Sequence, residues 1–192
     1  MKIDYNKLMY QEISSFGDKP KLLLHCCCAP CSSAVIERLK EYFDITYFYY
    51  NPNIYPKAEF ERRKDEFVKL GVNVLSLDYN HDDFLRAVRG LEMEPEGGAR
   101  CRACIAERLK ATFEYAVVNN YDMVTTTLSI SPHKDAEFIN MIGEKFEAIY
   151  GIKYLHADFK KQNGYLRSIE ICKDKGVYRQ DYCGCEFSIN NK

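Results

Sequence analysis

The sequence predicts an α/β fold: a doubly wound, mostly parallel, five-stranded sheet of the Rossmann-like (HUP-type) kind, followed by a cysteine-bearing C-terminal segment. Five short apolar segments recur along the chain, and amphipathic helical patterns separate them. Parallel strands joined through helices give right-handed crossovers and a sheet with helices on both faces. The 192 residues suffice for one core, so we expect a single α/β domain over 1–192, with 160–192 as a C-terminal appendage.

The first half of the chain is expected to alternate three strands with two helices. The segment KLLLHC (21–26) is short and apolar, and Ser32 or Ser33 is expected to cap the helix that follows it. The apolar face of that helix, over 34–42, consists of Val35, Ile36, Leu39 and Tyr42. The second helix, over 57–70, ends at Gly71, a residue suited to a helix C-terminus. The further strands are expected at 45–51 and 72–79.

The second half is expected to add two strands and the longer helices. A looser zone over 80–104 precedes a helix over 104–120, and the fourth strand follows at 123–130. Ser131 and Pro132 suit the cap and first turn of another helix, which leads to a fifth strand at 152–159. The tail is expected to hold one helix and a loop with cysteines.

Composition and charge exclude several classes of protein. The net charge of −1 and the isoelectric point of about 6.4 give no sign of a strongly basic nucleic-acid binder, so any such role depends on local patches. No apolar stretch approaches the ~20 residues of a membrane span, and the polar N-terminus lacks the apolar core of a signal peptide. We therefore expect a cytoplasmic protein without membrane association, whose nine cysteines serve metal or redox chemistry instead of structural disulfides.

The cysteines fall into three clusters and one isolated position. The clusters are Cys26-Cys27-Cys28 with Cys31, Cys101 with Cys104, and Cys183 with Cys185, whereas Cys172 stands alone on an expected helix. In a doubly wound sheet, the ligand site lies outside the carboxyl ends of the strands. The first cluster has this position, and a C-x-x-C spacing lets two thiolates reach one metal group.

Three other interpretations of the thiols are open. Free cysteines are often small buried hydrophobic residues. This interpretation is favoured for Cys172, and for Cys26 it is as open as a role in metal binding. A closed zinc site needs only four thiolates, such as those of Cys28, Cys31, Cys101 and Cys104. A zinc site of this kind would leave the other thiols unused. An iron–sulfur cluster takes thiolates from distant segments, and the remaining thiols then have a role in redox chemistry or in binding a second metal. The cysteine pattern therefore favours the cluster. A phosphate-binding loop is disfavoured, because CCCAPCSS has neither glycine nor lysine.

Six uncommon motifs follow one another between about Leu22 and Ser188. They are HCCCAPCS, YYNPNIYPKAEFERR, GARCRACIAERL, TTTLSISPHKD, ADFKKQNGYLRS and YRQDYCGCEFS. Together they resemble the cobalamin-independent epoxyqueuosine reductases. The resemblance implies a similar fold and the reduction of the epoxide of epoxyqueuosine to an alkene in the anticodon loop of tRNA, which gives queuosine. It also implies a four-iron four-sulfur (4Fe-4S) cluster with an additional metal ion near it, which we expect to be iron, and no cobalamin.

The resemblance also implies which thiols bind metal. By motif, the paired cysteines of the family correspond to Cys27 and Cys28, its C-x-x-C to Cys101 and Cys104, and its C-G-C to Cys183 and Cys185. We expect the cluster to bind Cys27, Cys28, Cys101 and Cys104. The second metal is expected to take ligands from Cys31, Cys183 and Cys185, with 160–192 closing the metal site. Cys26 and Cys172 lie outside the shared pattern.

Removal of the epoxide oxygen as water requires two electrons and two protons, whereas one cluster usually passes one electron at a time. Cys183 and Cys185 are therefore expected to be catalytic, either as a reversible disulfide or as ligands of a metal that polarises the epoxide oxygen. Asp158 ends an expected strand and suits a ligand of that metal or a proton donor, and Asp135 lies near the same rim. The alternatives are a helix cap at Asp135 and a loop carboxylate at Asp158.

The expected partners are a tRNA that carries epoxyqueuosine and an unidentified electron donor. Basic residues beside the motifs are expected to line one rim and pair with phosphates, among them Arg63, Arg108, Lys134 and Arg179. Tyr49, Tyr50 and Tyr55 are expected to stack an everted base, although for each alone a core position is the commoner role. Two other functions stay open: a zinc-stabilised RNA- or protein-binding module without turnover, and a metal-free thiol–disulfide enzyme.

Overall fold

The computed structural model describes residues 3–189. Its strands form one open, all-parallel, five-stranded sheet in the order β3-β2-β1-β4-β5, which confirms the predicted fold class. The strands are β1 (Lys21–His25), β2 (Asp44–Tyr49), β3 (Val74–Ser76), β4 (Met123–Thr126) and β5 (Lys153–Tyr154). From the central strand β1, the chain first adds β2 and β3 on one side and later β4 and β5 on the other. This reversal opens a crevice at the carboxyl ends of β1 and β4.

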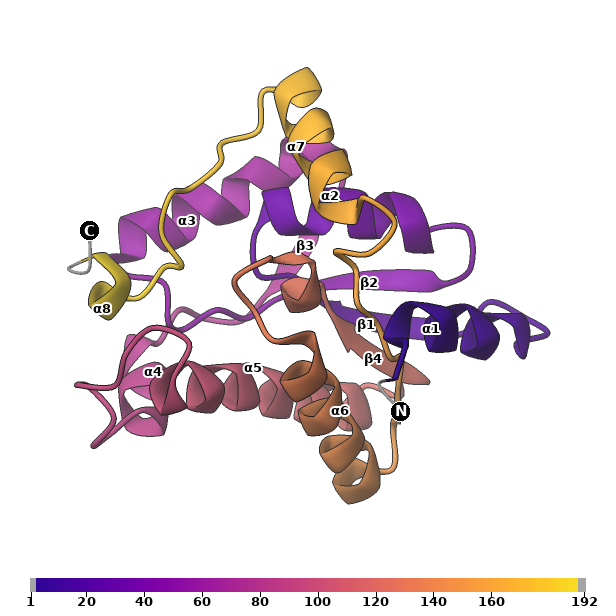
Figure 1. Ribbon diagram of the computed structural model, residues 1–192, viewed down its shortest axis with the longest axis horizontal. Helices are drawn as coiled ribbons and strands as arrows, with labels where there is room; N and C mark the ends of the chain where they lie inside the picture. Colours follow the sequence, from indigo (N-terminus) through magenta and orange to yellow (C-terminus); the bar gives the residue numbers. More distant parts are fainter. Residues whose placement is uncertain (1–2, 190–192) are drawn as a thin grey trace.

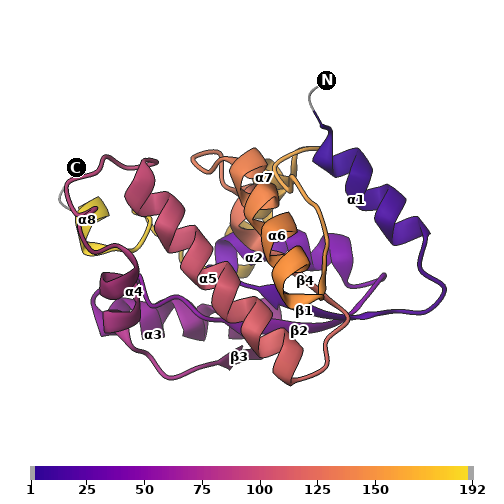
Figure 2. The same ribbon diagram turned by 90° about the horizontal axis from the view of Figure 1, so that it is seen from below.

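Helices cover both faces of the sheet (Figure 1). One face packs against α1 (Tyr5–Ser14), α2 (Ala29–Leu39), α3 (Lys57–Asp65) and α7 (Gly164–Lys175). The other face packs against α5 (Ala99–Val118) and α6 (Ala136–Tyr150), which lie side by side in Figure 2. The shorter helical elements are η1 (Glu66–Leu70), α4 (His81–Ala87), η2 (Thr127–Ile130) and α8 (Glu186–Ile189). Within residues 3–189, every helix is too short or too polar to span a lipid bilayer.

Strand β1 is apolar along its length because both of its faces are buried. Leu22 and Leu24 belong to the core formed with α1, α2 and α7, whereas Leu23 belongs to the core formed with α5 and α6. Successive side chains of a strand point to opposite faces, so a central parallel strand requires an uninterrupted apolar run.

The strands end earlier than predicted, and β4 shows the reason. Thr126 Oγ1 accepts a hydrogen bond from the backbone N–H of Leu128 (3.2 Å), which turns the chain into η2 at Thr127. The predicted strand over 123–130 therefore covers only Met123–Thr126. The residues beyond each strand form the loops at the carboxyl edge of the sheet.

Helix α2 begins earlier than predicted. Its N-cap is Cys28, and not Ser32 or Ser33, because Pro30 already occupies the first turn with the backbone angle that a helix start requires. The hydroxyl of Ser32 donates to the Cys28 carbonyl (2.8 Å) and that of Ser33 to the Pro30 carbonyl (2.9 Å), so both lie inside the helix.

Other helices also differ from prediction. Helix α6 begins after Asp135 and not at Ser131, because the Asp135 carboxylate caps it. Helix α5 begins at Ala99, so both Cys101 and Cys104 lie on it. Helices α1 and α4 occupy segments without a predicted helix; α1 packs its apolar face on the core.

The C-terminal segment returns to the carboxyl edge of the sheet. Helix α7 packs against α2, and the chain then runs along α3 and η1, where the Tyr178 N–H donates to Glu66 Oε2 (2.7 Å). It then reaches α8, which lies near α4 in Figure 1. Glu186 of α8 contacts His81 of α4 (3.0 Å). That 160–192 closes a metal site stays a prediction, and 190–192 lie outside the described residues.

Candidate active site

Three thiols lie together where β1 gives way to α2. Cys28 is the N-cap of α2, Cys31 lies in its first turn, and Cys27 precedes both. The Sγ atoms of Cys27 and Cys28 are 3.9 Å apart, and those of all three cysteines lie within 4.8 Å of one another. This spacing lets the three thiols bind one metal group.

Hydrogen bonds among these thiols favour one thiolate. The hydrogen bonds with Cys28 and Cys31, joined by one from Thr127 Oγ1 (3.3 Å), hold the pKa of Cys27 well below its usual value. The hydrogen bond with Cys27 raises the pKa of Cys28 to about 12 and also raises that of Cys31. Cys27 is therefore the most acidic thiol of this group, and metal binding would release the protons that its neighbours carry.

A second group of thiols lies on α5 and on the loop before α8. Cys101 and Cys104 are three residues apart on α5, so they share one face of the helix. Cys183 and Cys185 come from the loop, and all four thiols line one small cavity. Cys183 also lines a cavity of about 720 Å³ together with the three thiols that follow β1. Seven thiols thus surround two adjoining cavities at the carboxyl edge of the sheet.

Charge and burial give the thiols of the second group different pKa values. Lys134 Nζ lies 3.3 Å from Cys183 Sγ, and its positive charge is the main reason why the pKa of Cys183 is lowered. Burial raises the pKa of Cys104 to about 11 and raises that of Cys185 as well. Cys183 is therefore more acidic than its two buried neighbours.

A buried arginine also faces the thiols. Arg108 is 3% exposed, and its guanidinium donates to the Cys104 carbonyl (3.3 Å) and to Asn51 Oδ1 (3.4 Å). Burial lowers the pKa of Arg108, but the charges of Cys104 and Cys183 outweigh burial and raise it overall. A buried cation needs an anion beside it. The positive charges of Arg108 and Lys134 would therefore be balanced by thiolates in these cavities. The donor set therefore fits a thiolate-bound metal group.

Arg63 of α3 holds the C-terminal loop in place. Its guanidinium donates to the carbonyls of Cys183 (3.0 Å) and Tyr182 (3.4 Å) and pairs with Glu59 (2.7 Å). Gly184 follows with a φ of 137°, and a Cβ there would approach Arg63 Nη1 to 3.1 Å. Glycine is thus required between the two thiols of YCGC.

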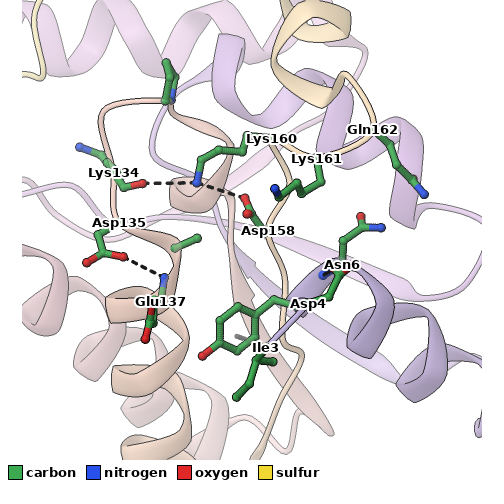
Figure 3. Close-up of a pocket in the computed structure, with 13 residues that line it drawn as sticks. Ile3, Asp4, Asn6, Lys134, Asp135, Glu137, Asp158, Lys160, Lys161 and Gln162 are labelled. Atoms are coloured by element: carbon green, nitrogen blue, oxygen red, sulfur yellow. Dashed lines mark hydrogen bonds and ion pairs between the residues drawn. The ribbon is translucent and has the colours of Figure 1, made fainter. Parts of the chain in front are cut away.

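The structure does not bring Asp158 among the thiols. It lines a separate cavity of about 800 Å³, whose described lining residues include no cysteine, and it pairs with Lys160 Nζ (3.1 Å; Figure 3). Asp135 caps α6, where its carboxylate accepts from the backbone amides of Glu137 (3.0 Å) and Phe138 (3.2 Å). The helix-cap alternative therefore describes Asp135, and the metal and proton-donor roles of the two aspartates stay predictions.

Two further cysteines and a histidine belong to the core. Cys26 and Cys172 are 0% and 2% exposed and lie in the cluster with α1, α2 and α7. His25 contacts Thr126 Oγ1 (2.8 Å) and donates through Nε2 to the Tyr50 carbonyl (3.1 Å), and burial lowers its pKa to about 4. These side chains are held by the protein interior and serve the fold.

The aromatic residues at the large cavity differ from those expected. Tyr49 and Tyr50 are buried in the core on either face of the sheet, which removes them as stacking surfaces. Tyr165 and Tyr182 line the cavity instead.

Asn53, Thr127 and Gln180 also lie at the site, and the sequence alone predicts no individual role for them. Asn53 lines both thiol cavities, and Thr127 Oγ1 donates to Cys27 Sγ. Their signal in the sequence is their place after β2 and β4, where ligand sites gather. Gln180 Nε2 donates to Cys28 Sγ (3.0 Å), and only the path of the folded loop brings it there.

Comparison with known proteins gives one consistent result. The family described as "Epoxyqueuosine reductase QueH" matches residues 22–191. The chain is 44% identical over 201 residues to the protein named epoxyqueuosine reductase QueH of Streptococcus pyogenes serotype M1, covering 97% of this chain and 78% of that protein. The protein of the same name from Thermotoga maritima is 34% identical over 175 residues, which cover 88% of this chain and 90% of that protein. The chain therefore belongs to the epoxyqueuosine reductase QueH family.

Proposed function

We propose that this protein reduces the epoxide of epoxyqueuosine in tRNA and thereby forms queuosine. Relatives that are 34% to 44% identical carry the name of this activity, and the match extends over most of the chain. An oxidoreductase of this kind needs redox-active groups beside a cavity that admits a modified nucleoside.

The observation that carries the proposal is the gathering of seven thiols around two adjoining cavities. They lie at the crevice between β1 and β4, where ligands bind in doubly wound sheets. Thiolates at this density serve metal and redox chemistry.

We infer that these thiols hold a 4Fe-4S cluster and a second metal ion, for which iron is the candidate. The four thiols on α5 and the C-terminal loop match the number of thiolates that such a cluster takes. The three thiols after β1 suit a metal ion that keeps an open coordination position. This division differs from that expected from sequence, which joined Cys27 and Cys28 to the cluster. When bound, the cluster supplies single electrons and the second metal polarises oxygen.

The side chains of Arg108 and Lys134 place positive charge at the wall of the large cavity. In the reaction both carbon–oxygen bonds of the epoxide break, a carbon–carbon double bond forms, and the oxygen leaves as water after uptake of two electrons and two protons. N–H donors fixed in advance near the oxygen stabilise the negative charge that develops on it. Asn51 holds Arg108 (3.4 Å), and Lys134 Nζ is held against Cys183 (3.3 Å).

The large cavity suits a nucleoside that has left the anticodon stack. Its volume of about 720 Å³ lies in the range of small-molecule sites, and chemistry inside a recessed cavity requires the base to be everted. Tyr165 and Tyr182 offer aromatic faces, and Arg179 offers a charge for phosphates. A separate electron donor delivers the two electrons of each turnover.

Turnover by anaerobically prepared protein tests the proposal. The protein is supplied with dithionite and tRNA that carries epoxyqueuosine, and the nucleosides are analysed by mass spectrometry. Loss of one oxygen atom from the modified nucleoside is expected. Zinc-only protein that binds tRNA without changing it would favour the zinc-stabilised module, and activity after complete removal of metal would favour a thiol–disulfide enzyme.

A further inference from the structure

A buried carboxamide in the wall of the thiol cavities has an oxygen without a partner. Asn53 is 2% exposed and lines both cavities. No hydrogen-bond donor among residues 3–189 reaches its Oδ1 atom. Because a buried acceptor left unsatisfied destabilises the folded protein, such an atom in a ligand cavity points to a donor that the ligand supplies.

The loop that carries Asn53 is fixed on both sides, and this fixes the backbone from which the side chain extends. Asn51 Nδ2 donates to the Cys26 carbonyl (2.9 Å), and the Ile54 N–H donates to the Asn51 carbonyl (3.1 Å). The Tyr79 hydroxyl donates to the Ile54 carbonyl (2.7 Å). The loop therefore holds Asn53 in the wall of both cavities, with an acceptor oxygen that no donor among the described residues satisfies.

A second carboxamide oxygen repeats this arrangement on the opposite segment. Gln180 lines the large cavity, and its Nε2 atom donates to Cys28 Sγ (3.0 Å). Its Oε1 atom is buried and has no partner among the described residues. Two free acceptors in one cavity select a ligand with hydroxyl or amine donors, and they disfavour a phosphate group, which only accepts.

We infer that Asn53 determines specificity for the substituent that carries the epoxide: its Oδ1 accepts a hydrogen bond from a hydroxyl or amine of that substituent, with Gln180 as a second acceptor. The inference rests on the proposed function, since it identifies the part of the nucleoside that enters the cavity. A site built to hydrogen-bond a ligand donor discriminates strongly against ligands that lack it.

Equilibrium binding of two tRNAs tests this assignment. One tRNA carries epoxyqueuosine, and the other carries the same base without the substituent that bears the epoxide. Both are titrated anaerobically, without reductant, into metal-loaded wild-type protein and the variants Asn53→Leu and Asn53→Asp. Leucine keeps the approximate shape but removes the acceptor, whereas aspartate retains it.

The wild-type protein is expected to prefer the tRNA that carries epoxyqueuosine, and Asn53→Leu is expected to weaken binding of that tRNA by about 10- to 100-fold. Binding of the tRNA that lacks the substituent should stay unchanged in both variants, and Asn53→Asp should keep the preference. If Asn53→Leu fails to fold, Gln180→Met carries the same comparison with a smaller expected loss.

Three results would overturn the inference. Equal weakening of both tRNAs would make Asn53 a general structural residue, and unchanged binding of both would mean that solvent satisfies Oδ1. Loss of metal from Asn53→Leu, with normal metal in the wild type, would assign the oxygen to the metal. Failure of the proposed function would be seen separately, as absence of epoxide reduction by the wild-type protein.

Discussion

Two thiols of the candidate site have a lower pKa than an ordinary cysteine, and the physical cause differs between them. Cys27 is stabilised as a thiolate by hydrogen bonds from its neighbouring thiols and Thr127. Cys183 is stabilised chiefly by the charge of Lys134. The thiolate is the form that binds metal and reacts with alkylating agents, so these causes can be separated by mutation.

We predict that Lys134→Gln slows alkylation of Cys183 in metal-free protein at neutral pH by about tenfold, because loss of the charge raises its pKa. Alkylation of Cys27 should change much less. Iodoacetamide labelling followed by peptide mass spectrometry gives both rates. Equal slowing at the two residues would show that the substitution acts through the fold and not through the local charge.

At the scale of elements, one arginine joins α3 to the loop that carries Cys183 and Cys185. Arg63 is 2% exposed and binds two carbonyls of the loop as well as Glu59. The thiols on this loop therefore depend on a helix about 120 positions earlier in the chain for their position.

We predict that Arg63→Ala lowers the free energy of unfolding by about 3 kcal/mol, because Glu59 and two loop carbonyls lose a buried partner. Urea unfolding measures the loss, and hydrogen exchange over 176–189 should show faster opening of the loop. The matched control is Arg62→Ala on the same helix, whose exposed guanidinium lies 3.5 Å from the ring centre of Tyr178. A control variant as unstable as Arg63→Ala would refute a specific role for the buried arginine.

A histidine joins α1 and α6 to the end of the sheet. His156 contacts Glu12 of α1 through Nδ1 (2.6 Å) and Glu144 of α6 through Nε2 (2.9 Å). Burial lowers the pKa of His156, but the two carboxylates outweigh it and raise the value above 6.5. Because the folded-state pKa exceeds that of the unfolded chain, this contribution is fully present below pH 6.5 and is lost as the pH rises through the folded-state pKa.

We therefore predict that His156→Gln is most destabilising at acidic pH. The difference in unfolding free energy between this variant and the wild-type protein should be largest near pH ~5.5 and should shrink by pH ~9. Urea unfolding across this range provides the measurement. A difference that does not vary with pH would show that packing, and not the charged pair, accounts for the contribution of His156.

At the scale of the whole molecule, the order of the strands decides which predicted residues meet. The clustered cysteines could be placed at one edge from sequence because Cys27 and Cys28 directly follow an apolar central strand. Asp158 also lies at the end of a predicted strand, but β5 is separated from β1 by β4, so the end of β5 opens toward another cavity. Hydrophobic patterns identify strands and do not fix their lateral order, which explains this difference.

The contacts between individual side chains could not be predicted from the sequence, for a different reason. The free acceptor of Asn53 and the hold of Arg63 on the loop depend on contacts between segments distant in sequence. Asp135 shows a similar ambiguity within one segment. An aspartate at the start of a helix can cap the helix or face a ligand site, and only the observed N-cap geometry distinguishes the two roles.

The central claim is that the gathered thiols hold the redox centre. Iron, acid-labile sulfide and turnover of epoxyqueuosine tRNA should be measured together in anaerobically reconstituted wild-type protein, Cys104→Ala and Cys172→Ala. Cys104 lines the thiol cavity, whereas Cys172 is buried in the core at 2% exposure. We predict that Cys104→Ala loses cluster iron, sulfide and activity together, while Cys172→Ala stays near the wild type in all three. Wild-type turnover by Cys104→Ala, or a Cys172→Ala variant that loses its iron, would contradict the account.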